Sequence, residues 1–489
     1  MCNDCDSANV GGFLSCVYEA AAEEETSYDV IIVGSGWAGI AAARKLSLNE
    51  VDNFIVLEAR DYIGGRSRSI NLSDGQPVDI GSSWVFNIGS SSNRNPVHQA
   101  VLDSGVSYTQ EGWISATYMS YGDGTLLDET FDRNVKDGLW VQFLNYVRSL
   151  QQNDQTDISL RVVTNDFMNS STMNVNEKKV FVMLLESRIV IRYGASLEVL
   201  SMFWYDDGNN FNGGGSTTIV KSYGDVIHHY ASSVSSKVNL NSVVNKIDYN
   251  GDRVEVTFNN DNQDSVLEAK HVIVTVPLGV LKDDMIQFKP PLPEVTQTAI
   301  ENLAMGTLDK VIFAWNADAQ LPWSTGWVQR ISSNIDNQGK WTEFYSLNHA
   351  FGGRPILVGF AAGKNADDLI ENVDDSTARN NMLEALRKMF GTANVPEPEE
   401  VIVKRWKQDP FARGSHSIYP TNSQRQDRQN LGNSINNKIF FAGEATHLDY
   451  WGSTHGALLS GIEGAEEVIS ILQGRNRRLR GGRKKKMYS

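Results

Sequence analysis

The chain has 489 residues, of which 41% are hydrophobic and 21% are charged. This length corresponds to about two to four domains, and the composition is that of an ordinary globular protein, which excludes intrinsic disorder, collagen and small disulfide scaffolds for the chain as a whole. The net charge of the chain is −15. Eight of the 44 basic residues lie at 475–489, so the rest of the chain has 36 basic and 59 acidic residues and a net charge of −23. An acidic body of this kind disfavours nucleic acid as a partner and favours cationic ligands.

The two ends of the chain differ from the part between them. The three cysteines are Cys2, Cys5 and Cys16, and the C-x-x-C pair has no second pair with which to bind zinc, so residues 1–27 are interpreted as a flexible N-terminus. Residues 474–489 form a basic tail, for which a nuclear-localisation or anionic-surface patch and a disordered solubilising tail are the alternatives. No run of about 18 apolar residues occurs, so no transmembrane segment is expected. The compartment stays open: the cytoplasm is favoured, with the nucleus or secretion as alternatives.

The first informative motif follows a short apolar run. Residues 30–33 (VIIV) and 54–57 (FIVL) predict two strands that are buried on both faces, and GSGWAG and IAAARKL between them predict a glycine-rich turn and a helix. In such a unit Gly34 permits the tight turn, Gly36 lets the backbone approach a pyrophosphate, and Gly39 lets the helix pack closely against the strand. The helix N-terminus offers free N–H groups to phosphates. This unit therefore predicts dinucleotide binding.

The residues after the second strand narrow the choice of dinucleotide. Glu58 lies 19 residues beyond Gly39, where a carboxylate accepts ribose hydroxyls and disfavours a 2′-phosphate, so FAD or NAD is favoured over NADP. Gly65 belongs to a glycine pair that allows another close backbone approach, and Arg66 can neutralise diphosphate charge, although a surface turn with a solvated arginine is the alternative. Residues 28–66 together resemble the N-terminus of the flavin-containing amine oxidase family, which includes polyamine oxidases, monoamine oxidases, L-amino-acid oxidases and flavin histone demethylases.

Further segments carry the same resemblance. Residues 79–84 (DIGSSW) resemble the family's Gly-Ala-x-Trp segment near the flavin, with Trp84 at its end. Residues 243–247 predict a strand, and in this family such a strand holds the adenine end of FAD through a valine backbone, here Val244. Residues 271–281 resemble the strand and turn that close the FAD domain after the insertion of a substrate domain.

Lys310 is the candidate catalytic residue. The alternation after it predicts a strand, at whose end a lysine would ordinarily be solvated. The family places a lysine here that holds a water at flavin N5, so the resemblance assigns this role to Lys310, and burial is expected to lower its pKa. The distal ammonium groups of a substrate need carboxylates or aromatic faces. Asp206 and Asp207 are candidates for this anchor, although an ordinary acidic loop is the simpler interpretation.

A segment near the C-terminus departs from the family pattern. Residues 406–417, which start at Trp406, resemble the family segment over the dimethylbenzene edge of the flavin. Monoamine oxidases carry a cysteine in this region for covalent attachment, whereas this chain has none after Cys16, so FAD is expected to be non-covalently bound. Many family members have an aromatic residue where His416 stands, and plant polyamine oxidases and monoamine oxidases have a tyrosine where Ser453 stands. The aromatic walls that flank the amine are therefore reduced.

The C-terminal block is the most specific part of the resemblance. The sequence KIFFAGEATH predicts a buried strand that ends at Gly443 and Glu444, and residues 452–462 predict the start of a helix. The small residues around Ser453 and Thr454 suit a helix N-terminus that packs against a flat ring, and the N–H groups there could face the flavin's N1–C2=O edge. The resemblance places Glu444 at the ribityl chain, and the block resembles spermine and acetylpolyamine oxidases more than monoamine oxidases.

The resemblance implies an α/β fold. It consists of a discontinuous Rossmann-like FAD-binding domain with an inserted α+β substrate domain, as in amine oxidases and p-hydroxybenzoate hydroxylase. Residues 28–98, 220–284 and 404–473 are expected to form the FAD-binding domain, and residues 99–219 and 285–403 the substrate-binding domain. The residues expected to contact FAD are Gly34, Gly36, Gly39, Glu58, Arg60, Gly65, Arg66, Trp84, Val244, Trp406, Gly443, Glu444, Ser453 and Thr454.

The activity implied is oxidation of a polyamine C–N bond by FAD and molecular oxygen, which gives an aldehyde, a shorter amine and hydrogen peroxide. The acidic body suits polycations, and no metal is expected. Another amine oxidase, for a monoamine or an L-amino acid, is the alternative, and Arg188 and Arg192 are candidates for binding an amino-acid carboxylate. Histone demethylation is less favoured because no long coiled-coil insertion interrupts the chain. A flavin-binding interaction protein without turnover is the remaining alternative, against which Lys310 argues.

Overall fold

The computed structural model describes the chain from residue 26 to residue 474, with internal gaps. Cys2, Cys5, Cys16 and the basic stretch 475–489 lie outside the described residues, so the predictions for the two ends of the chain stay predictions. Among the described residues, no helix combines the length and the apolar character that a membrane span requires. The described ranges are 26–90, 92–112, 117–121, 123–125, 127, 134–153, 156–208, 216–260, 263–323, 325–332 and 339–474.

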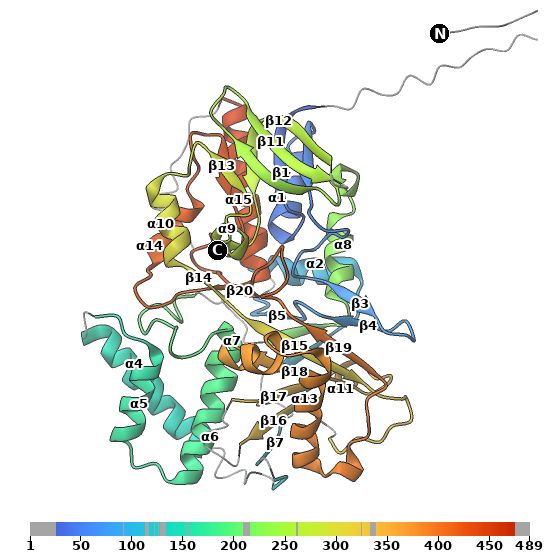
Figure 1. Ribbon diagram of the computed structural model, residues 1–489, viewed down its shortest axis with the longest axis vertical. Coiled ribbons are helices and arrows are strands. Elements are labelled where there is room, and N and C mark those ends of the chain that lie inside the picture. Colours follow the sequence, from blue (N-terminus) through green and yellow to red (C-terminus); the bar gives the residue numbers. More distant parts are fainter. Residues whose placement is uncertain are drawn as a thin grey trace, which may run out of the picture.

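The upper body in Figure 1 is built on a mixed sheet that joins distant parts of the chain. Strand β1 (Ser27–Val33) pairs in parallel with β2 (Phe54–Leu57) on one side and with β12 (Gln263–Val274) on the other. The C-terminal end of β12 also pairs in parallel with β21 (Ile439–Phe441). The other strands of this sheet are β9 (Val238–Asn239), β10 (Val243–Asp248), β11 (Val254–Asn260) and β13 (Gln287–Lys289).

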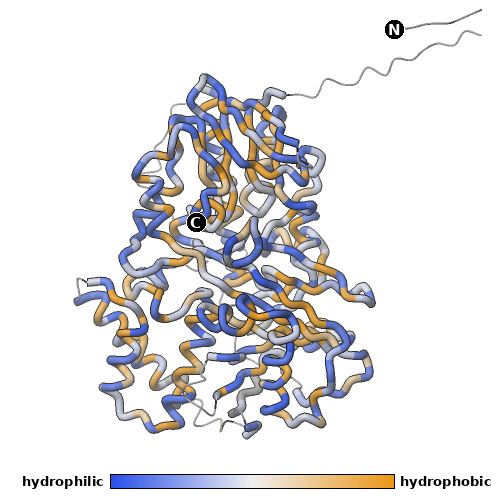
Figure 2. The backbone as a smooth tube through the Cα atoms, viewed as in Figure 1, coloured by the Kyte–Doolittle hydropathy of each residue, from blue (hydrophilic) through white to orange (hydrophobic). Residues whose placement is uncertain are grey.

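Both faces of this sheet are buried. Along β1, Ile31 and Val33 belong to one hydrophobic core, whereas Val30 and Ile32 belong to another. Because successive side chains of a strand point to opposite faces, a strand that is covered on both faces needs a continuous apolar run. Figure 2 shows hydrophobic segments along the strands of the upper body and hydrophilic ones toward its periphery. The doubly buried strand predicted from residues 30–33 is therefore confirmed.

Two long helices of the upper body pack against each other. Helix α1 (Trp37–Ser47) and helix α15 (Thr454–Leu472) share one hydrophobic core with β1. A Cβ at Gly461 would lie 2.0 Å from the carbonyl oxygen of Ala38, so this contact requires a glycine at position 461. The helices predicted after the glycine-rich turn and at residues 452–462 are therefore confirmed. The other helices around this sheet are α2 (Pro96–Ser104), α8 (Tyr223–Ala231), α9 (Leu278–Lys282), α10 (Glu294–Asn302) and α14 (Arg425–Gly432).

The lower body in Figure 1 contains a second, mostly antiparallel sheet. Strand β15 (Leu308–Ala314) lies between β18 (Ile356–Ala362) and β19 (Glu400–Lys404). The sheet continues from β18 through β17 (Glu343–Ser346) and β16 (Trp327–Ile331) to β7 (Thr117–Tyr121). Its helical segments are η1 (Asn134–Leu139), α4 (Trp140–Asn153), α5 (Leu160–Ser170), α6 (Val175–Leu185), η2 (Glu186–Val190), α7 (Ile191–Tyr193), α11 (Leu347–Phe351), α12 (Lys364–Ala366), η5 (Asp367–Glu371), α13 (Asp375–Phe390) and η6 (Thr392–Asn394).

Smaller sheets lie between the two bodies in Figure 1. Strand β14 (Ala304–Gly306) pairs with β20 (His416–Ile418), which places His416 at this junction. The remaining short elements are β3 (Ser69–Asn71), β4 (Pro77–Asp79), β5 (Trp84–Phe86), β6 (Tyr108–Gly112), β8 (Ser216–Val220) and η3 (Ser235–Lys237).

The α/β class predicted from the sequence is confirmed, with a mixed sheet and an antiparallel sheet. The strands predicted at 54–57 and 243–247 are also present. The burial expected for Lys310 is confirmed, and its alternative interpretation is wrong: β15 begins two residues before Lys310, which lies within the strand, and only 4% of it is exposed. It is therefore not a solvated residue at the end of a strand. The division of the chain into an FAD-binding and a substrate-binding domain stays a prediction.

Candidate functional site

An open cavity lies where the distant segments of the upper body meet. It is lined by the glycine-rich turn after β1, the loop after β2, the start of β10, the segment after β12, and residues near β20 and α15. Most of the residues expected to contact FAD therefore share one cavity. Those that line it are Gly34, Gly36, Glu58, Arg60, Gly65, Arg66, Val244, Gly443, Glu444, Ser453 and Thr454.

Four predicted site residues lie outside this lining. Gly39 faces the turn instead, because a Cβ there would lie 1.9 Å from the carbonyl oxygen of Gly34. Trp406 is buried, and its backbone N–H donates to a carboxylate oxygen of Asp309 at 2.9 Å. Lys310 lies on the second sheet, and the ring of Trp84, from β5, lies against it, with its centroid 5.4 Å from Lys310 Nζ. The cavity and the second sheet therefore carry different parts of the predicted site.

The glycine-rich turn has the shape that a phosphate cradle needs. Gly34 has a φ of +101°, a left-handed value that side chains rarely allow, and its N–H donates to the carbonyl oxygen of Leu57 at 2.8 Å. At Gly36 a Cβ would meet no atom within 4 Å, so the backbone borders open space. Gly36 also caps α1 without a side-chain hydrogen bond. The N-terminal N–H groups of α1 are therefore available to a diphosphate.

Glu58 is held in one orientation at the end of β2. Its Oε2 accepts hydrogen bonds from the backbone N–H and the hydroxyl of Ser35, both at 2.7 Å. Its Oε1 accepts a hydrogen bond from the backbone N–H of Arg60 at 2.9 Å. Only 3% of the residue is exposed. A carboxylate fixed in this way at the cavity wall is suited to accept hydroxyl groups of a ligand.

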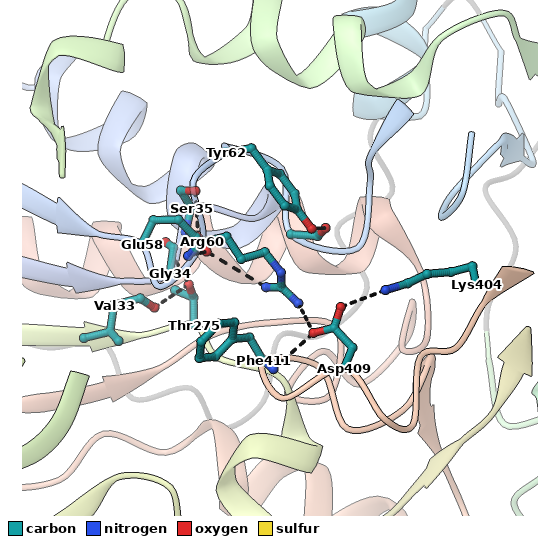
Figure 3. A network of polar contacts seen from close by, with 11 residues as sticks. Val33, Gly34, Ser35, Glu58, Arg60, Tyr62, Thr275, Lys404, Asp409 and Phe411 are labelled. Carbon is teal, nitrogen blue, oxygen red and sulfur yellow. Dashed lines mark hydrogen bonds and ion pairs between the residues drawn. The ribbon is translucent and has the colours of Figure 1, made fainter. Parts of the chain in front are cut away.

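Figure 3 shows an ion-pair network that ties Arg60 to the second sheet. Arg60 Nη2 lies 2.7 Å from Asp409 Oδ1, and Lys404 Nζ, at the end of β19, lies 2.8 Å from Asp409 Oδ2. The backbone N–H of Phe411 also donates to Asp409. Burial by itself would raise the pKa of Asp409, but the two cations outweigh it and hold that pKa below its usual value. The sequence offered no signal for the contact between Asp409 and Arg60, because these two residues lie 349 positions apart in the chain.

The side chain of Ser453 caps the N-terminus of α15. Ser453 accepts a hydrogen bond from the backbone N–H of Gly456 at 3.0 Å and donates to the carbonyl oxygen of Tyr450. A Cβ at Gly456 would lie 1.9 Å from that same carbonyl oxygen, so the tight turn before α15 requires a glycine there. The hydroxyl of Thr454 lies 2.8 Å from the hydroxyl of Tyr223. The first residues of α15 therefore present a rigid edge to the cavity.

Lys310 is buried in a polar pocket beside β4 and β5. Its Nζ donates to the carbonyl oxygens of Asp79 and Gly81 and, at 2.8 Å, to the hydroxyl of Ser83. Burial lowers the pKa of Lys310 to about 8, and the nearby Asp79 carboxylate opposes that shift. Burial raises the pKa of Asp79 to about 7. Lys310 is therefore an ammonium group that can lose its proton near neutral pH.

The sheet around Lys310 presents a mixed aromatic and acidic face. In register, Lys310 pairs with Phe360 on β18, Phe360 pairs with Glu343 on β17, and Glu343 pairs with Gln329 on β16. Directly paired residues point to the same face, so these side chains share one face. The ring of Trp84 lies against that face, with its centroid 5.6 Å from that of Phe360. The same face carries Trp327 and Tyr345, whose ring centroids lie 5.8 Å from that of Trp84.

Glu343 is a buried carboxylate that the sequence did not single out. Its Oε1 accepts hydrogen bonds from the hydroxyl of Ser187 at 3.2 Å and from Gln329 Nε2 at 3.1 Å. Among the described residues, no hydrogen bond reaches its Oε2. Burial raises its pKa to about 7, against the opposing effect of Gln329 and Ser187. Its burial depends on strand pairing, which the local sequence EFYS does not reveal.

The sequence candidates for substrate binding do not line the cavity. Asp207 forms an ion pair with Arg425 at 2.7 Å, and Asp206 lies 3.4 Å from the side-chain amide of Gln151. The two candidate arginines lie elsewhere: the guanidinium of Arg188 lies 5.0 Å from the ring centroid of Trp140, and that of Arg192 lies 5.6 Å from the ring of Tyr193. His416, in contrast, lines the cavity.

Known proteins resemble this chain along most of its length. The family model described as flavin containing amine oxidoreductase matches residues 37–469. Probable polyamine oxidase 4 of Arabidopsis thaliana is 30% identical over 449 residues, which cover 89% of this chain and 86% of that protein. Lysine-specific histone demethylase 1 homologs 2 and 1 of Arabidopsis thaliana are each 29% identical over 464 residues, which cover 92% and 91% of this chain but only 59% and 53% of those proteins.

A solved structure of wild-type putrescine oxidase bound to putrescine has the same fold. Its TM-score is 0.71 at 18% sequence identity, and the match covers 91% of this chain and 100% of that one. FAD is the cofactor typical of the family that the model describes. The family match spans nearly all of the described residues, and the chain therefore belongs to the flavin-containing amine oxidoreductase family.

Proposed function

We propose that this protein oxidises a C–N bond of a polyamine with non-covalently bound FAD and molecular oxygen, and that it gives an aldehyde, a shorter amine and hydrogen peroxide. The observation that carries the proposal is the position of Lys310, which is buried on a sheet face that also bears an aromatic cluster and Glu343. The net charge of −15 also favours a polycationic substrate over an anionic one.

The cavity fits FAD at several points. The open space beside Gly36 and the uncapped N-terminus of α1 would take the diphosphate, and the fixed carboxylate of Glu58 would accept ribose hydroxyls. The chain has no cysteine after Cys16 that could form a covalent link, which supports non-covalent binding. When bound, FAD supplies the two-electron acceptor for the C–H bond next to the amine nitrogen.

Lys310 would manage a proton at the reacting end of the substrate. Aliphatic amines are ammonium ions in neutral water, but they react through the uncharged nitrogen. A group near the reacting nitrogen must therefore accept or hold its proton. The pKa of Lys310, lowered by burial to about 8, lets Nζ change its protonation state near neutral pH. The carbonyl and hydroxyl acceptors around Nζ fix its position on the sheet while it does so.

Glu343 would anchor the distal ammonium group. It lies two strands away from Lys310 on the same face, which corresponds to about 10 Å between backbones. Phe360 lies between the two, and apolar and aromatic surface suits the methylene chain and cationic nitrogens of a polyamine. A bound ammonium ion would also lower the pKa of Glu343 from its raised value and keep the carboxylate ionised.

Anaerobic titration tests the proposal directly. The purified protein should be yellow, and spermine, spermidine or acetylspermine should bleach the flavin absorbance, whereas benzylamine and L-amino acids should not. Bleaching by L-amino acids alone, or by benzylamine alone, would contradict the polyamine assignment. A yellow protein that none of these amines bleaches would contradict the enzymatic proposal as a whole.

Demethylation of a methylated lysine is a second candidate, because two of the relatives carry that name. It uses the same C–N oxidation on a different amine. A methylated histone H3 peptide, added under the same anaerobic conditions, separates the two candidates: bleaching by the peptide and not by spermine would favour the demethylase.

A further inference from the structure

Arg428, on helix α14, is a fully buried charge that neither the family resemblance nor the proposed mechanism explains. None of the residue is exposed. Its Nη1 donates to the hydroxyl of Ser417 at 2.6 Å and to the carbonyl oxygen of Ala445 at 3.1 Å. Its guanidinium carbon lies 4.3 Å from the ring centroid of Tyr419 and 4.6 Å from that of Trp451. A buried guanidinium is expensive to desolvate, so its partners indicate what it stabilises.

The partners of Arg428 lead to the cavity through Ser417. The hydroxyl of Ser417 accepts from Arg428 and donates to Glu444 Oε2 at 2.5 Å. The backbone N–H of Ser417 also donates to Glu444. A hydroxyl with a cation on one side and a carboxylate on the other has only one favourable orientation. Arg428, Ser417 and Glu444 therefore form a directed chain of hydrogen bonds that ends at the cavity wall.

Glu444 is surrounded by donors. Besides the two from Ser417, Arg66 Nη1 donates to its Oε1 at 3.0 Å, and the backbone N–H of Gly452 donates to its Oε2 at 3.1 Å. Burial alone would raise the pKa of Glu444, but Arg66, Arg428 and Ser417 outweigh it, so this pKa lies below its usual value. A protonated Glu444 would point a hydrogen at one of these donors and would break that contact.

Among the described residues near Glu444, no group other than Arg66 supplies the positive charge that Arg428 provides. His416 also faces Glu444, but burial lowers its pKa, so its imidazole is neutral at pH 7. Burial raises the pKa of Tyr419, which keeps its hydroxyl neutral. Asp207 influences Arg428 from a distance but is itself paired with Arg425. Arg66 and Arg428 are therefore the two cations that balance Glu444.

We propose that Arg428 is a positioning residue for FAD: through Ser417 it keeps Glu444 ionised and oriented toward the cavity. The ionised carboxylate can then accept hydroxyl groups of the cofactor, while Arg66 stays aligned at the cavity wall beside it. This inference rests on FAD being the cofactor and not on the identity of the amine, so it stands even if the polyamine proposal fails.

The test measures FAD binding and not turnover. Full-length holoprotein is diluted at pH 6, 7 and 8, and free FAD is separated by ultrafiltration and measured by its fluorescence. The wild-type dissociation constant should be nearly flat over this range. In Arg428→Met, the Glu444 pKa should rise toward this range, and FAD should bind more weakly as the pH falls, by up to about tenfold per pH unit.

Further variants separate positioning from a merely structural role. Arg428→Lys, which keeps a charge that can reach Ser417, should restore most of the flat profile. In the Arg428→Met, Glu444→Gln double variant the pH dependence should disappear, because the titrating carboxyl is gone. The proposal would be overturned if Arg428→Met weakened FAD binding equally at every pH, or if FAD binding by the double variant still depended on pH.

A milder variant covers the case in which Arg428→Met does not fold. Ser417→Ala keeps the buried charge but removes the hydroxyl that connects it to Glu444. It should show the same direction of pH dependence with a smaller slope. If Ser417→Ala binds FAD as tightly as the wild type at every pH, the hydrogen bonds through Ser417 do not position Glu444, and the proposal is overturned.

Discussion

Arg60 and Asp409 are separated by 349 positions in the chain, yet their side chains meet at 2.7 Å. Arg60 follows the strand of the glycine-rich unit, and Asp409 follows the last strand of the second sheet. Both side chains are about nine-tenths buried, at 10% and 11% exposure. The pair therefore fixes the cavity wall to the sheet that carries Lys310, and under the proposed function it would keep the bound flavin aligned with the substrate.

Removing the charge of Asp409 should loosen this connection. Asp409→Asn leaves Arg60 and Lys404 without their common anion, and breaking a buried ion pair in this way costs about 3 kcal/mol. The free energy of unfolding, measured with urea at pH 7, should fall by roughly that amount.

The effect of Asp409→Asn should also depend on pH. Because the pKa of Asp409 is depressed in the folded protein, its contribution to stability is present above the pKa of the unfolded state and is lost as the pH falls through the pKa of the folded state. The difference between the two proteins should therefore shrink at acidic pH, and a constant difference would contradict the ion-pair explanation.

Two glycines of the turn give a matched pair of variants. At Gly36 a Cβ meets no protein atom within 4 Å, so Gly36→Ala should leave the stability of the FAD-free protein nearly unchanged but obstruct the diphosphate. FAD affinity, measured by fluorescence titration, should drop at least about tenfold, the equivalent of 1.4 kcal/mol.

Gly39→Ala should behave in the opposite way. Its Cβ would lie 1.9 Å from the carbonyl oxygen of Gly34, so the fold itself has to shift. The thermal midpoint of the FAD-free protein should fall clearly in Gly39→Ala and not in Gly36→Ala. Equal loss of stability in both variants would show that the space beside Gly36 is not reserved for a ligand.

The sequence could predict the parts of the site that depend on neighbours in the chain. Gly34, Gly36 and Glu58 lie within one strand–turn–helix–strand unit, so their spacing alone implies their relative positions. Glu343 and Asp409 could not be found in this way. Glu343 is buried on the face of Lys310 only through the pairing of three strands, and Asp409 meets its partner across 349 positions. Such contacts follow from tertiary packing, for which a single sequence carries no local signal.

Replacing Lys310 should separate proton handling from cofactor binding. Lys310→Met should keep the yellow colour, because Lys310 does not line the cavity. Reduction of the flavin by a polyamine, followed by anaerobic stopped flow, should slow by about 10²–10⁴-fold. The wild-type rate should also change near pH 8, where Lys310 titrates, and this inflection should disappear in the variant.

Lys282 provides the control for that experiment. It is a partly buried lysine whose Nζ donates to the carbonyl oxygens of Ile300, Glu301 and Leu303, so its surroundings resemble those of Lys310. Burial also lowers its pKa. Lys282→Met should lower stability and leave the inflection near pH 8 in place. An inflection that persists in Lys310→Met would remove Lys310 from the mechanism.

Glu343→Gln tests whether the buried carboxylate selects polyamines. The amide keeps an oxygen that can accept from Ser187 and Gln329, so folding should be preserved, whereas a charge-assisted bond to an ammonium ion is lost. The KM for spermidine should rise by about 10–100-fold, as expected for about 1.5–3 kcal/mol, while kcat should stay nearly unchanged, because the lost bond is to a distal nitrogen that does not react. Glu186→Gln is the matched control: Glu186 is also buried with a pKa raised to about 7, but it contacts Asn365 and not Gln329. If both variants raise the KM for spermidine equally, the effect comes from the loss of any buried negative charge in the lower body, and Glu343 is not the anchor.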